Sequence, residues 1–135
     1  MCQEALRLAA LRGIVVDIIL PEKSNHTLAN IAQNRYLREL TKAGVRLWFL
    51  SDKIVHAKAL AIDNSFAMTW SANMDIRSLF LNYEVMSSFY TESDIKWLAH
   101  WLETLRDRCY RYYPQEVGSL KEMLEGLVLL TAYQL

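Results

Sequence analysis

The segment spanning residues 56–63, with the sequence HAKALAID, constrains the fold of this chain more than any other feature. Its apolar residues favour a β-strand, and it places an imidazole two positions before a lysine. Because side chains alternate across a strand, His56 and Lys58 are expected on one face, together with Leu60 and Ile62. A nucleophile or proton carrier beside a fixed cation suits phosphoryl chemistry. The segment therefore predicts a strand that carries a reactive site.

The first 50 residues predict a parallel βαβ unit with one further helix before it. Apolar residues at helical spacing indicate helices over 3–12 and 28–40, and each is followed by a glycine. Compact apolar runs over 14–20 and 45–50 indicate buried strands. A helix between two strands is the connection that parallel pairing requires.

The remaining sequence predicts three strands followed by two helices. The strands cover 55–62, 66–71 and 82–90, and a turn at Asp63-Asn64 joins the first two. Helical spacing of apolar residues returns over 95–105 and again over 120–128.

Composition limits the partners and cofactors. Fifteen basic and fifteen acidic residues cancel, so nucleic acid is not an expected partner. No run approaches the roughly 20 apolar residues that a membrane-spanning helix needs, so the chain itself is expected to be soluble or peripheral. No cluster of histidine, cysteine and carboxylate residues has metal-ligand spacing, and we expect neither a metal nor a cofactor.

The pattern H-x-K-x4-D at 56–63, followed by S-x-N at 71–73, resembles the signature motif of the phospholipase D superfamily. Three further segments narrow the resemblance to the C-terminal half of bacterial cardiolipin synthases, namely KSNH at 23–26, AGVR at 43–46 and DIRSLFLNYEV at 75–85. The resemblance implies an α/β fold: one phospholipase D-like domain over 1–135, with a mixed β-sheet flanked by helices and two C-terminal helices.

The resemblance also assigns catalytic roles. His56 would attack phosphorus and form a phosphohistidine, while Lys58 would hold the non-bridging phosphate oxygens. Glu84 would orient the imidazole of His56 through its Nδ1–H. The alternatives for these residues are a hydrogen-bonded core histidine, a solvated lysine and an exposed glutamate on an edge strand.

Three more positions belong to the resemblance. Ser71 and Asn73 would donate hydrogen bonds to the same phosphate oxygens. Asp63 matches the aspartate of the catalytic motif. Its offset of seven residues from His56 puts it on the opposite strand face, which favours a structural role in the turn after the strand. The chain departs from the family at Trp70, where a glycine usually precedes the serine.

The family's chemistry uses two histidines, and this chain carries one such motif. The second is expected from a missing N-terminal half, because the first helix lacks the strand that precedes it in the family, or from a second copy of the chain. The resemblance implies a phosphatidyl transferase that acts on phospholipid, most plausibly phosphatidylglycerol, at the bacterial cytoplasmic membrane. Two alternatives stay open: a dimeric endonuclease with the same histidine chemistry, and a non-catalytic fragment.

Overall fold

The computed structural model describes residues 2–22, 27–51, 56–72, 83–115 and 118. The described residues divide between two compact units, one within residues 1–51 and 111–135 and the other within residues 52–110. The first unit holds a sheet of strand order β1-β2-β6 and the second a sheet of order β3-β4-β5. The expected α/β class, with parallel and antiparallel strand pairs, is confirmed, and the strands form two three-stranded sheets.

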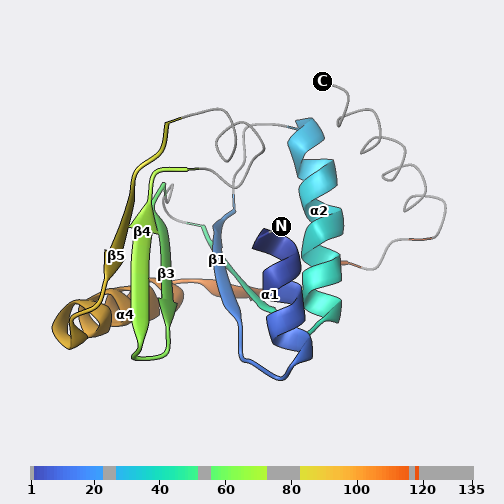
Figure 1. Ribbon diagram of the computed structural model, residues 1–135. Coiled ribbons are helices and arrows are strands. Elements are labelled where there is room, and N and C mark those ends of the chain that lie inside the picture. The colour runs from blue at the N-terminus through green and yellow to red at the C-terminus, as the bar shows by residue number, and fades with distance from the viewer. Residues whose placement is uncertain (1, 23–26, 52–55, 73–82, 116–117, 119–135) are drawn as a thin grey trace. The chain divides into compact units, whose positions relative to one another are not determined.

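In the first unit, α1 (Cys2–Leu11), β1 (Asp17–Pro21), α2 (Thr27–Lys42) and β2 (Arg46–Leu50) follow in the predicted order. Strands β1 and β2 pair in parallel, with Asp17 opposite Arg46. Figure 1 shows α1 and α2 next to each other, beside β1. Helix α2 ends at Lys42, and Gly44 follows with a φ of 101°, which is accessible to a residue without Cβ. The amide of Val45 then donates to the carbonyl of Leu40.

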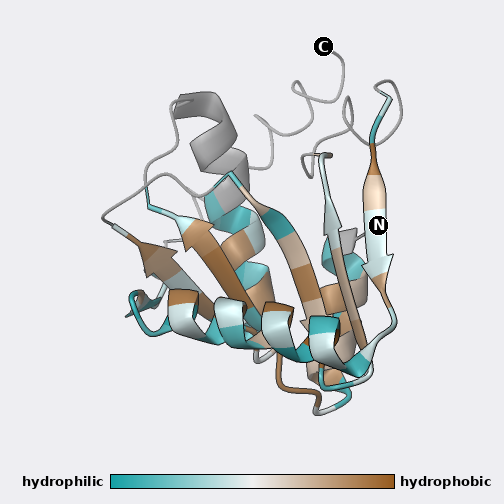
Figure 2. Cartoon of the chain, turned by 90° about the vertical axis from the view of Figure 1, so that its left-hand side faces the viewer, coloured by the Kyte–Doolittle hydropathy of each residue, from teal (hydrophilic) through white to brown (hydrophobic). Residues whose placement is uncertain are grey.

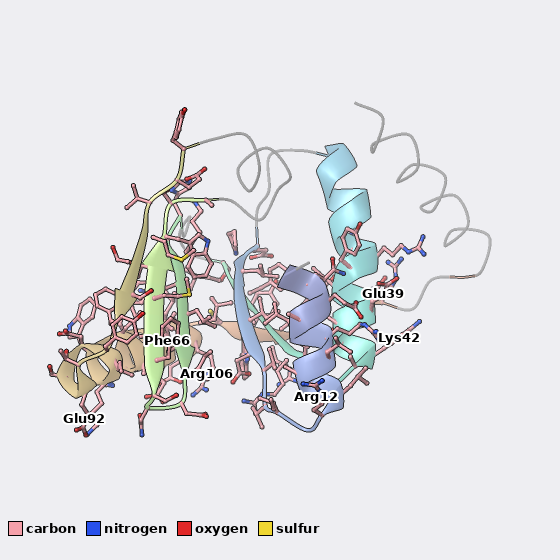
Figure 3. The ribbon with its side chains drawn as sticks, in the orientation of Figure 1. Arg12, Glu39, Lys42, Phe66, Glu92 and Arg106 are labelled. Atoms are coloured by element: carbon pink, nitrogen blue, oxygen red, sulfur yellow. The ribbon has the colours of Figure 1, made fainter. Side chains whose placement is uncertain are left out.

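The core of this unit lies between the helices and one face of the sheet. Its buried members come from α2, β2 and the turn between them: Leu37, Leu40, Val45, Leu47 and Phe49. The exposed side chains of Glu39 and Lys42 point away from the sheet on the outer side of α2 (Figure 3). The strand β6 (Tyr110–Tyr112), which the sequence reading missed, completes the sheet, and the Tyr112 ring packs edge-on against Phe49 at 4.3 Å between centroids.

The second unit contains β3 (Lys58–Ile62), β4 (Phe66–Trp70), β5 (Met86–Phe89) and α4 (Glu92–Arg106). The sheet is antiparallel, with Lys58 opposite Trp70 and Trp70 opposite Met86. The strands predicted over 55–62 and 82–90 are Lys58–Ile62 and Met86–Phe89 in the structure. Residues 56–57 and 83–85 precede these strands, and residues 55 and 82 lie outside the described residues.

Helix α4 packs on the sheet of the second unit through a small core. Ile95 and Leu98 are 3 % and 2 % exposed and contact the fully buried Ala67 of β4. The helix begins after Thr91, and Glu92 and Asp94 place negative charge near its N-terminus. Figure 2 shows the mixed hydropathy of α4 against the more uniformly apolar β4. The predicted helix over 120–128 lies outside the described residues.

Candidate functional site

The second unit brings three chain segments together at one end of its sheet. Strand β3 begins at Lys58, β4 ends at Trp70 and β5 begins at Met86, and these three residues share one rung of the ladder. The residues immediately beyond that rung are Ala57, Ser71 and Val85. The predicted site residues His56, Ser71 and Glu84 are therefore gathered by the antiparallel register, although 28 positions separate the first from the last.

His56 and Lys58 are in direct contact. The Lys58 Nζ lies 3.0 Å from Nε2 and 3.3 Å from Nδ1 of the His56 ring. The prediction that both lie on one strand rested on a strand reaching back to residue 55, whereas His56 precedes β3. The ammonium carries only donors, so this contact is a hydrogen bond to a ring nitrogen that offers its lone pair. His56 is exposed and Lys58 is half-buried.

Ser71 and Glu84 form a second contact at the same end of the sheet. The Ser71 hydroxyl donates a short hydrogen bond to the Glu84 carboxylate and accepts one from the backbone N–H of Val85 at 3.0 Å. The amide of Ser71 also donates to the carbonyl of Val85 at 3.0 Å. Among the described residues, the hydrogen bond of Glu84 is with Ser71, and none joins it to His56. Asn73 lies outside the described residues.

Asp63 lies away from these groups. It occupies the turn between β3 and β4 with a φ of 47°, a left-handed conformation that aspartate tolerates better than most residues. Strand β3 begins at Lys58 and ends at Ile62, so this turn lies at the opposite end of the strand from the histidine-lysine contact. At about 3.3 Å per residue, the two ends of the strand are roughly 13 Å apart.

A cavity of about 370 Å³ adjoins the histidine-lysine contact. Its polar lining includes His56, Lys58 and Ser71, so the cavity and the site share walls. Trp70, which stands where the family usually has glycine, forms part of the wall and is half-buried. The aromatic lining from α4 was not predicted from the sequence, because helical spacing places those residues near the sheet without showing that a cavity lies beneath them.

In the described ranges no group of three or more histidine, cysteine or carboxylate side chains is arranged to hold a metal ion. The same part of the chain contains no helix with the length and hydropathy of a membrane span.

Comparison with known proteins gives a consistent result. Residues 2–106 match the family model described as cardiolipin synthase, PLD-like domain. The chain is 43 % identical over 94 residues to cardiolipin synthase 1 of Bacillus anthracis, covering 67 % of this chain and 18 % of that protein. It is 38 % identical over 104 residues to the cardiolipin synthase of a Geobacillus species, covering 76 % and 21 %.

A solved structure shares the fold. The phospholipase D family member Nuc from Salmonella typhimurium superposes with a TM-score of 0.67 at 25 % identity, covering 82 % of this chain and 72 % of that one. The chain spans about a fifth of the length of the curated relatives it matches. The family match over residues 2–106 places this chain among the phospholipase D-like domains of the cardiolipin synthase family.

Proposed function

We propose that this chain supplies one catalytic motif of a phosphatidyl transferase of the cardiolipin synthase type. The contact between the His56 ring and the Lys58 ammonium at 3.0 Å carries the proposal, since it sets a nucleophile beside a cation that can bind a phosphodiester. The cardiolipin synthase relatives support phospholipid as the substrate class.

In the proposed reaction, Lys58 moves its hydrogen bond from the His56 ring to a phosphate oxygen, and the ring nitrogen thereby released attacks the phosphorus of phosphatidylglycerol. The bond from phosphorus to the glycerol oxygen breaks, and the departing glycerol takes a proton from a histidine of a second motif. The hydroxyl of another phosphatidylglycerol then attacks the phosphohistidine, returns its proton to that second histidine and releases His56. The products are cardiolipin and glycerol.

The other predicted residues have supporting roles in this proposal. Lys58 neutralises the charge that develops on the non-bridging oxygens, and Ser71 and Asn73 donate hydrogen bonds to them. Glu84 orients the His56 ring and stabilises its positive charge. The location of Asp63 supports a role in the turn.

The second motif must come from another polypeptide segment. It is supplied either by residues of a longer protein or by a second copy of the chain, and we place the working enzyme at the cytoplasmic membrane surface, where its substrate lies. Assaying the chain at increasing concentration separates the two sources, because a homodimer gains specific activity with concentration.

The test is incubation with phosphatidylglycerol labelled in its terminal glycerol and, separately, in its phosphate. We expect released glycerol, labelled cardiolipin and an acid-labile phospho-adduct on His56. The variant His56→Ala should lose all three, whereas His100→Ala, which removes an exposed imidazole on α4, should retain them. An unchanged activity in His56→Ala would contradict the proposal.

An endonuclease is the second candidate, because it would use the same histidine contact on a phosphodiester. The equal numbers of basic and acidic residues weigh against it, since binding to a DNA backbone needs a basic surface. A DNA affinity that falls steeply with salt would support it. Absence of any adduct on His56 with either substrate would support a non-catalytic domain.

A further inference from the structure

We propose that the cavity beside His56 and Lys58 binds the glycerol-proximal part of one acyl chain of the substrate phospholipid. The inference rests on the proposed function and adds to it the place where the apolar part of the lipid lies. All residues that line the cavity belong to the second unit.

Small side chains line the cavity along the β3 segment, and large side chains line it along α4. Ala57 and Ala59 come from the segment that enters and begins β3, while α4 contributes Trp97, Leu98 and Trp101. Ala59 is opposite Thr69 on the sheet face that packs toward α4. Side chains of one carbon at the edge of this face leave space that larger residues would fill.

Tryptophan is concentrated around this cavity. Three of the four tryptophans in the chain line it: Trp70, Trp97 and Trp101. Trp97 is 67 % exposed, although it lies on α4 between the buried residues Ile95 and Leu98. An apolar ligand that covers this ring removes a large aromatic surface from water, which is a favourable change.

The size of the cavity suits a small ligand. Its volume of about 370 Å³ lies within the range of small-molecule sites.

The chemistry of the lining identifies the ligand class. The residues His56, Lys58 and Ser71 border the cavity and belong to the candidate site, where an anionic phosphate would bind, while the alanine, leucine and tryptophan walls suit hydrocarbon. A phospholipid joins these two properties within a few bond lengths.

The test measures binding of monomeric phosphatidylglycerols with chains of six, seven or eight carbons, below their micellar concentrations, by calorimetry. If one chain enters the cavity, each added methylene per chain should tighten binding by up to about fourfold. Ala57→Phe fills the cavity from an exposed position outside β3 and should remove this dependence. Trp97→Ala should weaken it, and Trp97→Phe, which keeps an aromatic wall, should restore most of it.

Tyr90→Ala is the matched control, because Tyr90 is a 78 % exposed aromatic residue that does not line the cavity. It should leave the chain-length dependence intact. The same dependence in Ala57→Phe as in the unmodified chain, or no dependence in either, would overturn the inference. Lys58→Met should weaken binding of every lipid by one common factor. If Lys58→Met has no effect while Ala57→Phe removes the chain-length dependence, the cavity inference stands and the proposed function fails.

Discussion

Replacement of Leu98 by alanine tests whether α4 is held on the sheet of the second unit as the structure shows. Leu98 is 2 % exposed and contacts the core around Ala67. Leucine-to-alanine changes in protein cores cost about 2–5 kcal/mol, and the cost rises with the volume of the void left behind. Leu98 also borders the cavity, so the vacated space joins an existing opening. We therefore expect about 2–3 kcal/mol, toward the low end of that range.

Leu47 provides the comparison in the first unit. It is 0 % exposed on β2, and its removal leaves a sealed void, for which we expect about 4 kcal/mol. With a urea dependence of about 2 kcal/mol per molar, the midpoint should fall by roughly 1.2 M for Leu98→Ala and about 2 M for Leu47→Ala.

Urea unfolding followed by tryptophan fluorescence measures the effect on the second unit. In a Trp48→Phe background the remaining tryptophans all lie in residues 52–110, so their emission reports on that unit. Val85→Ala is the control, because it shortens a 72 % exposed aliphatic side chain and should cost less than about 0.5 kcal/mol. If Leu98→Ala is no more destabilising than Val85→Ala, the packing of α4 on this sheet is wrong.

Three further outcomes are expected. Asp17→Asn should cost about 1–2 kcal/mol in urea unfolding, because the carboxylate accepts hydrogen bonds from Arg46 Nε at 2.6 Å and from a tryptophan indole at 2.7 Å; no loss would contradict a contribution from this network. Burial raises the pKa of the Cys109 thiol, so its alkylation in a Cys2→Ala variant should reach half its maximal rate at a higher pH when folded than in urea. The same shift makes stability fall as pH rises through the unfolded thiol's pKa; equal alkylation profiles would refute it. Asp63→Gly should preserve stability at a φ of 47°, whereas Asp63→Val should lower it by about 1–2 kcal/mol, measured by thermal unfolding.

Helices α1 and α4 could be predicted from the sequence because the spacing of apolar residues that indicates a helix involves only residues close together in the chain. Apolar spacing predicted a helix over 3–12, and the structure has Cys2–Leu11; likewise residues 95–105 fall within Glu92–Arg106. Gly44, just after α2, is likewise a local signal for the end of a helix, because glycine readily adopts the positive φ found there. These features depend on residues within four positions of one another.

Strand ends and the short strand β6 depend on partners that are distant in sequence. The apolar residue Val85 favours extended structure, but it precedes β5, whose first residue Met86 pairs with Trp70, the last residue of β4. Strand β6 (Tyr110–Tyr112) is three residues long and has an arginine at its centre, so its hydrophobic pattern is too short to predict a strand. Its place is set by the β1-β2-β6 sheet, which links it to residues more than 60 positions earlier.

The site residues could be named from their motif, but their contacts could not. The sequence analysis paired Glu84 with His56, and the structure gives the Glu84 carboxylate a hydrogen bond from Ser71. Nothing local to residue 84 indicates this contact, because it requires the pairing of β4 with β5. The wall formed by Trp97 likewise required the packing of α4 on the sheet.

The hydrogen bonds of Ser71 couple two steps of the proposed mechanism. Its hydroxyl has one proton, and that proton is donated to Glu84, while its oxygen accepts from the amide of Val85. If this hydroxyl donates to a phosphate oxygen, as proposed, it must withdraw its proton from the Glu84 carboxylate. That carboxylate then loses the hydrogen bond from Ser71, and the Nδ1–H of His56 is the donor that the proposed mechanism assigns to it. In this scheme, phosphate binding at Ser71 is itself what makes Glu84 available to orient the nucleophile.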